Sequence, residues 1–292
     1  MIILDGKEIA LNKFPDGTLL LKESIQPYID NNCREARIVW HFENNEEMIA
    51  IMFLARHLQS NGVVFVHLVM PYIPNARQDR VKTNEDVFTL KYFTEFINSL
   101  GFNSVTVLDP HSSVSEALID NLIVESPERF IQRAINEIQN RAIISDMPVN
   151  LNSERSLMLF FPDEGAMKRY SGMLKMNYAF GIKKRDWRTG VIQGLDVSGQ
   201  TDKIKDSAVL IIDDICSKGG TFYHSAKKLK ELGAKNIYLY VSHCENSVLY
   251  GDMIKSGLIE KVYTTNSIFT ERHEKIEVMN YENESYVVNR LL

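Results

Sequence analysis

The sequence predicts an α/β protein made of mainly parallel sheets flanked by helices. Short apolar runs rich in Val, Ile and Leu alternate with amphipathic segments, and four of these runs are followed at once by charged or glycine-rich stretches. Strands of a parallel sheet are buried on both faces and therefore read as continuous apolar runs, with helices as the crossovers between them. The composition, 45% hydrophobic and 24% charged, supplies enough apolar residues for a packed core.

The elements are expected in a regular order along the first half of the chain. Apolar runs predict strands, and helical spacing of apolar residues predicts helices. The expected strands are 37–42, 63–70 and 104–108, and the expected helices are 46–59, 87–100 and 127–140.

The second half repeats this alternation. The expected strands are 156–161, 178–182, 208–212, 236–242 and 261–265, and the expected helices are 165–176 and 221–232. The polar stretch 148–156 (PVNLNSERS) suggests a boundary between two similar domains, 1–147 and 148–292, with the last residues as candidates for returning to the first domain.

Charge and cysteine content exclude several classes of protein. The net charge of −5 argues against non-specific nucleic-acid binding, which needs an excess of Lys and Arg. The three cysteines show no CxxC spacing, which argues against a zinc site or a disulfide framework. The chain has no long apolar run and no secretory pattern at its start, so a soluble, cytoplasmic protein is expected.

The strongest candidate site is the segment 209–221, VLIIDDICSKGGT. A buried strand leads into an acidic pair, two glycines and a helix start. Gly219 and Gly220 allow the backbone to approach a ligand, and the amides before Thr221, with the helix N-terminus, form an anion-binding cradle. Asp213 and Asp214 can accept hydrogen bonds from sugar hydroxyls. The pattern predicts a sugar-phosphate site.

This segment resembles the phosphoribosyl-diphosphate loop of type I phosphoribosyltransferases and of ribose-phosphate diphosphokinases, the PRPP synthetases. Four further segments are similar to the PRPP synthetases alone: 70–81 (MPYIPNARQDRV), 107–112 (VLDPHS), 162–170 (PDEGAMKRY) and 182–185 (IKKR). Their order and approximate spacing also agree. The resemblance implies two phosphoribosyltransferase-like domains, with ATP bound by the first and the ribose phosphate by the second.

The resemblance also implies roles for individual residues. It assigns ATP binding to Phe14, Asp16, Arg77, Gln78, Asp79 and His111. It assigns ribose-phosphate binding to Asp163, Asp213, Asp214, Ser217, Lys218, Gly219, Gly220 and Thr221. Magnesium is expected with the nucleotide, near His111 and Asp163. Lys183 and Arg185, with Lys184 as an alternative in the register, are expected to stabilise the charge on the transferred group.

The implied reaction is attack of the ribose 1-hydroxyl on the β-phosphorus of Mg-ATP, giving AMP. The implied partners are ATP and a ribose phosphate, with neither nucleic acid nor membrane. A homo-oligomer, dimer or larger, is also expected.

The sequence departs from the family pattern at three places. The family loop DDxxDTGGT has become DDICSKGGT, so Ser217 replaces an acid and Lys218 a threonine. This change raises a 5′-extended ribose such as ADP-ribose as an acceptor beside ribose 5-phosphate. The family's FSDGE is FPDGT here, with Thr18 in place of the acid. Few residues precede it, so a shortened N-terminal unit is expected, and the family hexamer and its allosteric site are not carried over.

Two other functions stay open at this point. A catalytically silent, PRPP synthetase-like regulatory subunit would show loss of the phosphate loop or of the basic segment, and both are recognisable here. A phosphoribosyltransferase would share the DD–GGT loop but would not need the ARQDR and DPHS segments.

Overall fold

The computed structural model describes residues 1–30, 34–144, 157–185 and 192–282. The chain forms two compact units, Met1–Ser126 and Pro127–Leu292. Each unit holds one sheet that is mainly parallel and carries its own helices, which confirms the predicted fold class.

The first unit is organised around a six-stranded sheet in the order β2-β1-β5-β6-β7-β8. Its strands from β5 onward run parallel, whereas β1 runs antiparallel to both β2 and β5. The strands are β1 (Ile2–Leu4), β2 (Lys7–Glu8), β5 (Glu35–Trp40), β6 (Phe65–Val69), β7 (Ser104–Leu108) and β8 (Leu122–Glu125). The helices are α1 (Gln26–Asp30), α2 (Glu46–Ser60), α3 (Thr89–Ser99) and α4 (Ser113–Leu118), and a small hairpin joins β3 (Asn12–Lys13) to β4 (Leu19–Leu20).

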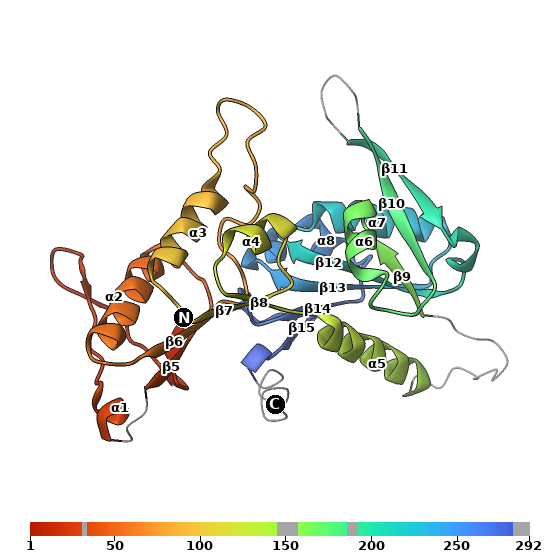
Figure 1. Cartoon of the computed structure of the whole chain (residues 1–292). Helices are drawn as coiled ribbons and strands as arrows, with labels where there is room; N and C mark the ends of the chain where they lie inside the picture. The colour runs from red at the N-terminus through yellow and green to blue at the C-terminus, as the bar shows by residue number, and fades with distance from the viewer. Residues whose placement is uncertain (31–33, 145–156, 186–191, 283–292) are drawn as a thin grey trace. The chain divides into compact units, whose positions relative to one another are not determined.

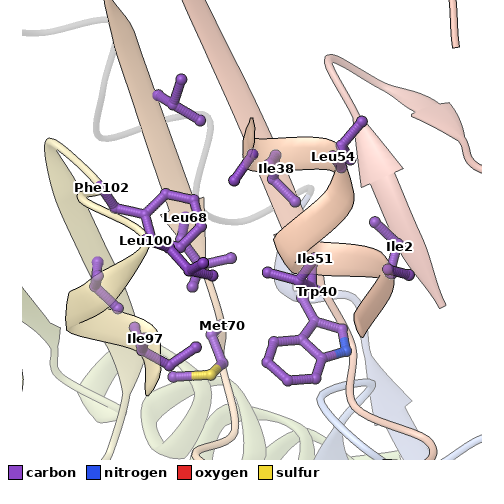
Figure 2. Close-up of a cluster of buried hydrophobic side chains, with 14 of the residues drawn as sticks. Ile2, Ile38, Trp40, Ile51, Leu54, Leu68, Met70, Ile97, Leu100 and Phe102 are labelled. Carbon is purple, nitrogen blue, oxygen red and sulfur yellow. The ribbon is translucent and has the colours of Figure 1, made fainter. Parts of the chain in front are cut away.

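Helices α2 and α3 bury their apolar stripes against strands β5 and β6 (Figure 2). Leu54 and Ile97 bring helical side chains into the cluster that holds Trp40, and all three are fully or almost fully buried. The Trp40 indole also donates a hydrogen bond of 2.9 Å to the buried Glu47 carboxylate, which ties the end of β5 to the first turn of α2. This packing fixes the edge of the sheet from which the loops after β5 and β6 leave.

The second unit contains a seven-stranded sheet in the order β11-β10-β9-β12-β13-β14-β15. All its pairs are parallel except β10 with β11. The strands are β9 (Leu157–Phe161), β10 (Tyr178–Arg185), β11 (Ile192–Gly199), β12 (Ala208–Cys216), β13 (Asn236–Cys244), β14 (Lys261–Thr265) and β15 (Ile276–Met279). The helices are α5 (Glu128–Ile144), α6 (Glu164–Tyr170), α7 (Gly220–Glu231) and α8 (Asp252–Ser256), with 3-10 helices η1 (Thr201–Lys203) and η2 (Asn246–Tyr250). Strands β10 and β11 form a hairpin that projects beyond the other strands of this sheet (Figure 1).

Helix α5 packs on the second sheet, against β13 and β14. The Lys261 ammonium lies 3.1 Å from the Glu137 carboxylate of this helix, and the Phe130 ring stacks on Tyr281 at a centroid separation of 6.5 Å. Along the chain, the division between the two compact units falls between Ser126 and Pro127, before α5, whereas the sequence suggests a boundary after it. The proposed return of the last residues to the first domain concerns 283–292, which lie outside the described residues.

Most of the predicted strands and helices are present within a few residues of their expected ends. Strand β12 is the important exception, because it continues past Ile212 to Cys216 and so includes the acidic pair. The extension follows from the length of β13, which pairs with β12 as far as Cys216 and Cys244. Helix α6 is shorter than expected, and β1 to β4, β8, β11 and β15 were not predicted, since short or edge strands lack a long apolar run.

Candidate functional site

The loop between β12 and α7 turns sharply from the end of the strand into the start of the helix. Gly219 is the N-cap residue of α7 and has a left-handed φ of 78°, which a residue with a side chain adopts only at a cost. Because of this turn, the chain passes directly from the end of β12 into the first turn of α7. The backbone N–H groups of that turn have no partner inside the helix and carry its positive dipole end.

The segment that follows β13 is in close contact with this loop. A Cβ atom on Gly251 would lie 1.9 Å from the carbonyl oxygen of Lys218, so no larger residue fits there. A Cβ atom on Gly219 would lie 2.8 Å from the Met253 sulfur. The loop is thus packed against the start of α8, and its conformation depends on that contact.

The acidic pair differs in environment although both residues belong to β12. Asp214 is buried, and its carboxylate lies 3.5 Å from the Arg169 guanidinium of α6. Asp213 is partly exposed, and one of its oxygens accepts a hydrogen bond of 3.0 Å from the backbone N–H of Asp214. Arg169 of α6 therefore contacts the second residue of the acidic pair.

The pKa of Asp213 is raised well above its usual value. The main cause is the removal of water from around its carboxylate, although the residue as a whole is partly exposed, and the repulsion of Asp214 and then of Asp163 adds to it. Asp163 is the N-cap residue of α6, where its carboxylate accepts a 3.0 Å hydrogen bond from the Ala166 N–H. The carboxylates of Asp163 and Asp214 thus repel that of Asp213 at the ends of β9 and β12, and a bound cation or hydroxyl donor would reduce this repulsion.

Ser217 and Lys218, the two residues that depart from the family loop, have different surroundings. The Ser217 hydroxyl donates a 2.6 Å hydrogen bond to Glu245, which directly follows β13. Lys218 has an exposed side chain. Sequence reasoning missed Glu245, because its link to the loop spans 28 positions and exists only through the pairing of β12 with β13.

The segment 77–79, expected to bind the nucleotide, lies between β6 and α3 in the first unit. Gln78 accepts a 2.8 Å hydrogen bond from the Thr89 hydroxyl at the start of α3. Asp79 is buried and is held by two hydrogen bonds from Arg80, of 2.7 and 2.9 Å, which lower its pKa. Asp79 is therefore placed to hold the Arg80 side chain, a structural use that the sequence did not indicate.

The other expected nucleotide residues of the first unit lie in two loops. His111 follows β7, two residues after the buried Asp109, whose φ of 43° is left-handed. Phe14 lies at the turn of the β3–β4 hairpin and is 49% exposed. In the same turn, Asp16 accepts hydrogen bonds from the Thr18 hydroxyl and N–H, of 2.7 and 3.0 Å, which lower its pKa. Phe14 is thus available to a planar ligand.

The basic segment belongs to the β10–β11 hairpin. The backbones of Lys183, Lys184 and Arg185 form the last three residues of β10, where Lys183 is paired with Leu195 and Arg185 with Ile192. A register irregularity lies between Lys184 and Arg185. The side chains of all three residues lie outside the described part of the structure.

No group of three or more His, Cys, Asp or Glu side chains forms a metal-binding cluster within the described residues. Magnesium in nucleotide sites usually keeps several waters and takes only one or two carboxylates besides phosphate oxygens. Asp163, which lies close enough to Asp213 to raise its pKa, fits such a partial set of ligands. In the described part of the chain, every helix is too short or too polar to cross a membrane.

No protein-family model matches the sequence. Individual relatives do match, and they share one name. The chain is 27% identical over 263 residues to the ribose-phosphate pyrophosphokinase of Thermococcus kodakarensis, covering 87% of this chain and 81% of the relative. It is also 27% identical over 288 residues to the same enzyme of Pyrococcus abyssi, covering 94% and 88%.

A bacterial relative and a solved structure agree with these matches. Ribose-phosphate pyrophosphokinase 1 of Listeria monocytogenes is 27% identical over 238 residues, covering 80% of this chain and 70% of the relative. The crystal structure of phosphoribosylpyrophosphate synthetase from Mycobacterium smegmatis shares the fold with a TM-score of 0.73 at 16% identity, covering 97% of this chain and 89% of that one. The chain is thus similar over most of its length to the ribose-phosphate pyrophosphokinases, and it shares the fold of a phosphoribosylpyrophosphate synthetase.

Proposed function

We propose that this protein transfers the β,γ-diphosphate of Mg-ATP to the 1-hydroxyl of a ribose that carries a 5′-phosphate. The observation that carries the proposal is the β12–α7 junction, where an acidic pair within a strand leads into the left-handed turn of Gly219 and the start of a helix. Such a junction offers acceptors for sugar hydroxyls and amide donors for a phosphate within one short segment.

Different residues of the β12–α7 segment bind different parts of the acceptor. The amides of the loop up to Thr221 hold the 5′-phosphate, and Asp213 and Asp214 accept hydrogen bonds from the ribose hydroxyls. Ser217, Lys218 and Gly220 complete the loop. This kind of transfer asks the protein mainly for positioning and charge stabilisation, so no covalent intermediate is needed.

The nucleotide is assigned to the first unit. Arg77 suits phosphate oxygens because its guanidinium is a fixed, planar donor, and Gln78 and Asp79 belong to the same loop. Phe14 and Asp16 are assigned to the base. Magnesium, proposed near His111 and Asp163, would neutralise charge on the phosphates. Lys183 and Arg185, or Lys184 in the shifted register, stabilise the developing charge.

The acceptor is either ribose 5-phosphate or a 5′-extended ribose such as ADP-ribose. Two features support the extended acceptor: Lys218 is exposed beside the loop, and position 217 carries a serine in place of an acid. Together they make the charge at the loop more positive, which favours the binding of a larger anion. Ribose 5-phosphate would place the enzyme in nucleotide biosynthesis, and ADP-ribose would place it in NAD metabolism. We also propose that the chain self-associates as a dimer or larger, which sedimentation velocity would test.

The test is AMP formation from Mg-ATP by the purified protein, with ribose 5-phosphate or ADP-ribose as acceptor. Phosphorus NMR would show the diphosphate on the ribose 1-carbon. AMP with either acceptor, lost in Asp213→Asn but kept in the exposed control Asp202→Asn, supports the proposal. No AMP with both acceptors would favour the regulatory-subunit function. Release of diphosphate from PRPP with a base would instead make the chain a phosphoribosyltransferase.

A further inference from the structure

Tyr250 presents an exposed aromatic ring next to the loop between β12 and α7. It is 76% exposed, the highest value among the exposed large hydrophobic side chains of the described residues. The next residue, Gly251, lies against the backbone of that loop, since a Cβ atom on Gly251 would come within 1.9 Å of the Lys218 carbonyl oxygen. Consecutive Cα atoms are about 3.8 Å apart, so Tyr250 lies one residue from this contact.

The backbone that carries Tyr250 is held in place by hydrogen bonds. Tyr250 is the last residue of η2, and Asn246 is the first. The Asn246 side chain donates a 2.7 Å hydrogen bond to the Thr270 hydroxyl and accepts one of 3.1 Å from the Thr270 N–H. Val248 of the same turn is fully buried. A ligand that contacts the Tyr250 ring therefore has to order only the two torsions of that side chain, which keeps the entropic cost of binding low.

Two exposed lysines lie near Tyr250. Lys218 belongs to the loop itself, and the Lys255 ammonium of α8 donates a 3.0 Å hydrogen bond to the Tyr250 carbonyl. Two acids lie in the same region. Asp252 is exposed at the start of α8, and the partly exposed Glu245 carboxylate accepts hydrogen bonds from two serine hydroxyls. The two ammonium groups thus remain the exposed donors that phosphate oxygens can reach beside the ring.

A 5′-extended ribose has an outer part that the loop amides alone do not bind. This part consists of a second phosphate and, in a nucleoside diphosphate ribose, a further ribose and a base. An aromatic ring stacks on a base, and a lysine ammonium binds phosphate oxygens as a point charge. Tyr250 and the two lysines supply both kinds of group next to the loop that is proposed to bind the inner phosphate.

We propose that Tyr250, Lys218 and Lys255 form a subsite for the outer nucleotide of a nucleoside diphosphate ribose. The base stacks on the Tyr250 ring, and the outer phosphate binds the two ammonium groups. This subsite depends on the proposed function of the same loop, and it makes Tyr250 a specificity-determining residue for the acceptor. Because every base has a π-face, Tyr250 does not by itself choose among the bases.

Three substitutions separate the ring from the charges. Tyr250→Ala removes the ring, Tyr250→Phe keeps the ring without its hydroxyl, and Lys255→Ala removes one ammonium group. Because the Tyr250 ring is exposed, its loss should leave the melting temperature unchanged. Tyr92→Ala is the matched control, because Tyr92 is an exposed tyrosine on α3 of the first unit.

The experiment measures kcat/KM for ADP-ribose, ribose 5-diphosphate and ribose 5-phosphate at saturating Mg-ATP. Calorimetric Kd values are measured with a non-hydrolysable ATP analogue, which keeps ADP-ribose out of the nucleotide site. Tyr250→Ala is expected to raise KM and Kd for ADP-ribose about tenfold, through the loss of one base–aromatic stack, and to leave the other two acceptors unchanged. Tyr250→Phe and Tyr92→Ala should resemble the wild type. Lys255→Ala should weaken ADP-ribose and ribose 5-diphosphate but not ribose 5-phosphate.

The possible results separate the subsite from the transferase function. A wild-type protein that uses ribose 5-phosphate but neither binds nor uses ADP-ribose overturns the subsite and leaves the transferase function intact. The subsite is also overturned if Tyr250→Ala changes the Kd for ADP-ribose no more than that for ribose 5-phosphate. A wild-type protein that forms no AMP and binds none of the acceptors overturns the function itself.

Discussion

The guanidinium of Arg169 lies 3.5 Å from the carboxylate of Asp214 and so joins helix α6 to strand β12 beside the loop that leads into α7. Asp214 is 4% exposed, which leaves its charge dependent on this partner and on its other contacts. A buried carboxylate needs a compensating cation, so the pair links the stability of the second unit to the integrity of the site.

Arg169→Ala is expected to lower the free energy of unfolding by about 1–2 kcal/mol and to lower kcat/KM, because it leaves the Asp214 carboxylate buried without this cation. Urea unfolding and AMP formation would measure the two effects. The matched control is Lys168→Ala on the same helix, whose side chain is 75% exposed and lies 4.0 Å from Glu164. Equal stability of the two variants would contradict the prediction.

Gly219→Ala is expected to raise the KM or Kd for the ribose phosphate by about tenfold or more. The new methyl group would combine an unfavourable left-handed φ with a contact of 2.8 Å to the Met253 sulfur, so the loop or the Met253 side chain must shift. Gly257→Ala is the control, because Gly257 also has a positive φ of 69° but no atom within 4 Å of its added Cβ. If both substitutions change binding alike, strain alone explains the effect and the packing argument fails.

Asp213→Asn is expected to raise the melting temperature of the ligand-free protein at neutral pH while abolishing activity. The folded state raises the pKa of Asp213 above 3.8, so the protonated form is favoured on folding. Its contribution to stability is present below the unfolded pKa and is lost as the pH rises through the folded value. Melting curves against pH should therefore fall less steeply above pH 4 in Asp213→Asn than in wild type. The exposed control Asp202→Asn should follow the wild-type curve.

Lys183→Ala and Arg185→Ala are each expected to lower kcat by about 10²–10³ with a smaller change in KM, because their charges act on the transferred group and not on the ground state. Lys184→Ala tests the register: a larger loss in this variant than in its neighbours would move the assignment by one residue. The exposed Lys175→Ala in the same unit is the control. Unchanged kcat in all three variants would remove the basic segment from the mechanism.

The sequence alone was sufficient to predict the order of the main strands and helices and the family resemblance, because both depend on patterns within short stretches of residues. The apolar run and the two glycines of 209–221 predict a strand, a turn and a helix without reference to the rest of the chain. Gly219 is an example, because glycine favours the left-handed turn that the chain makes there. Strand ends were less predictable, as β12 shows, because a partner strand decides where pairing stops.

The tertiary structure decided which side chains meet. Asp214 with Arg169, Ser217 with Glu245, and the Lys218 backbone with Gly251 are contacts between segments far apart in the chain. They depend on the parallel register of β9, β12 and β13, and on how the following helices pack, which no short stretch of residues encodes. The sequence therefore determined the kind of cradle, and the packing of neighbouring strands determined the charges that surround it.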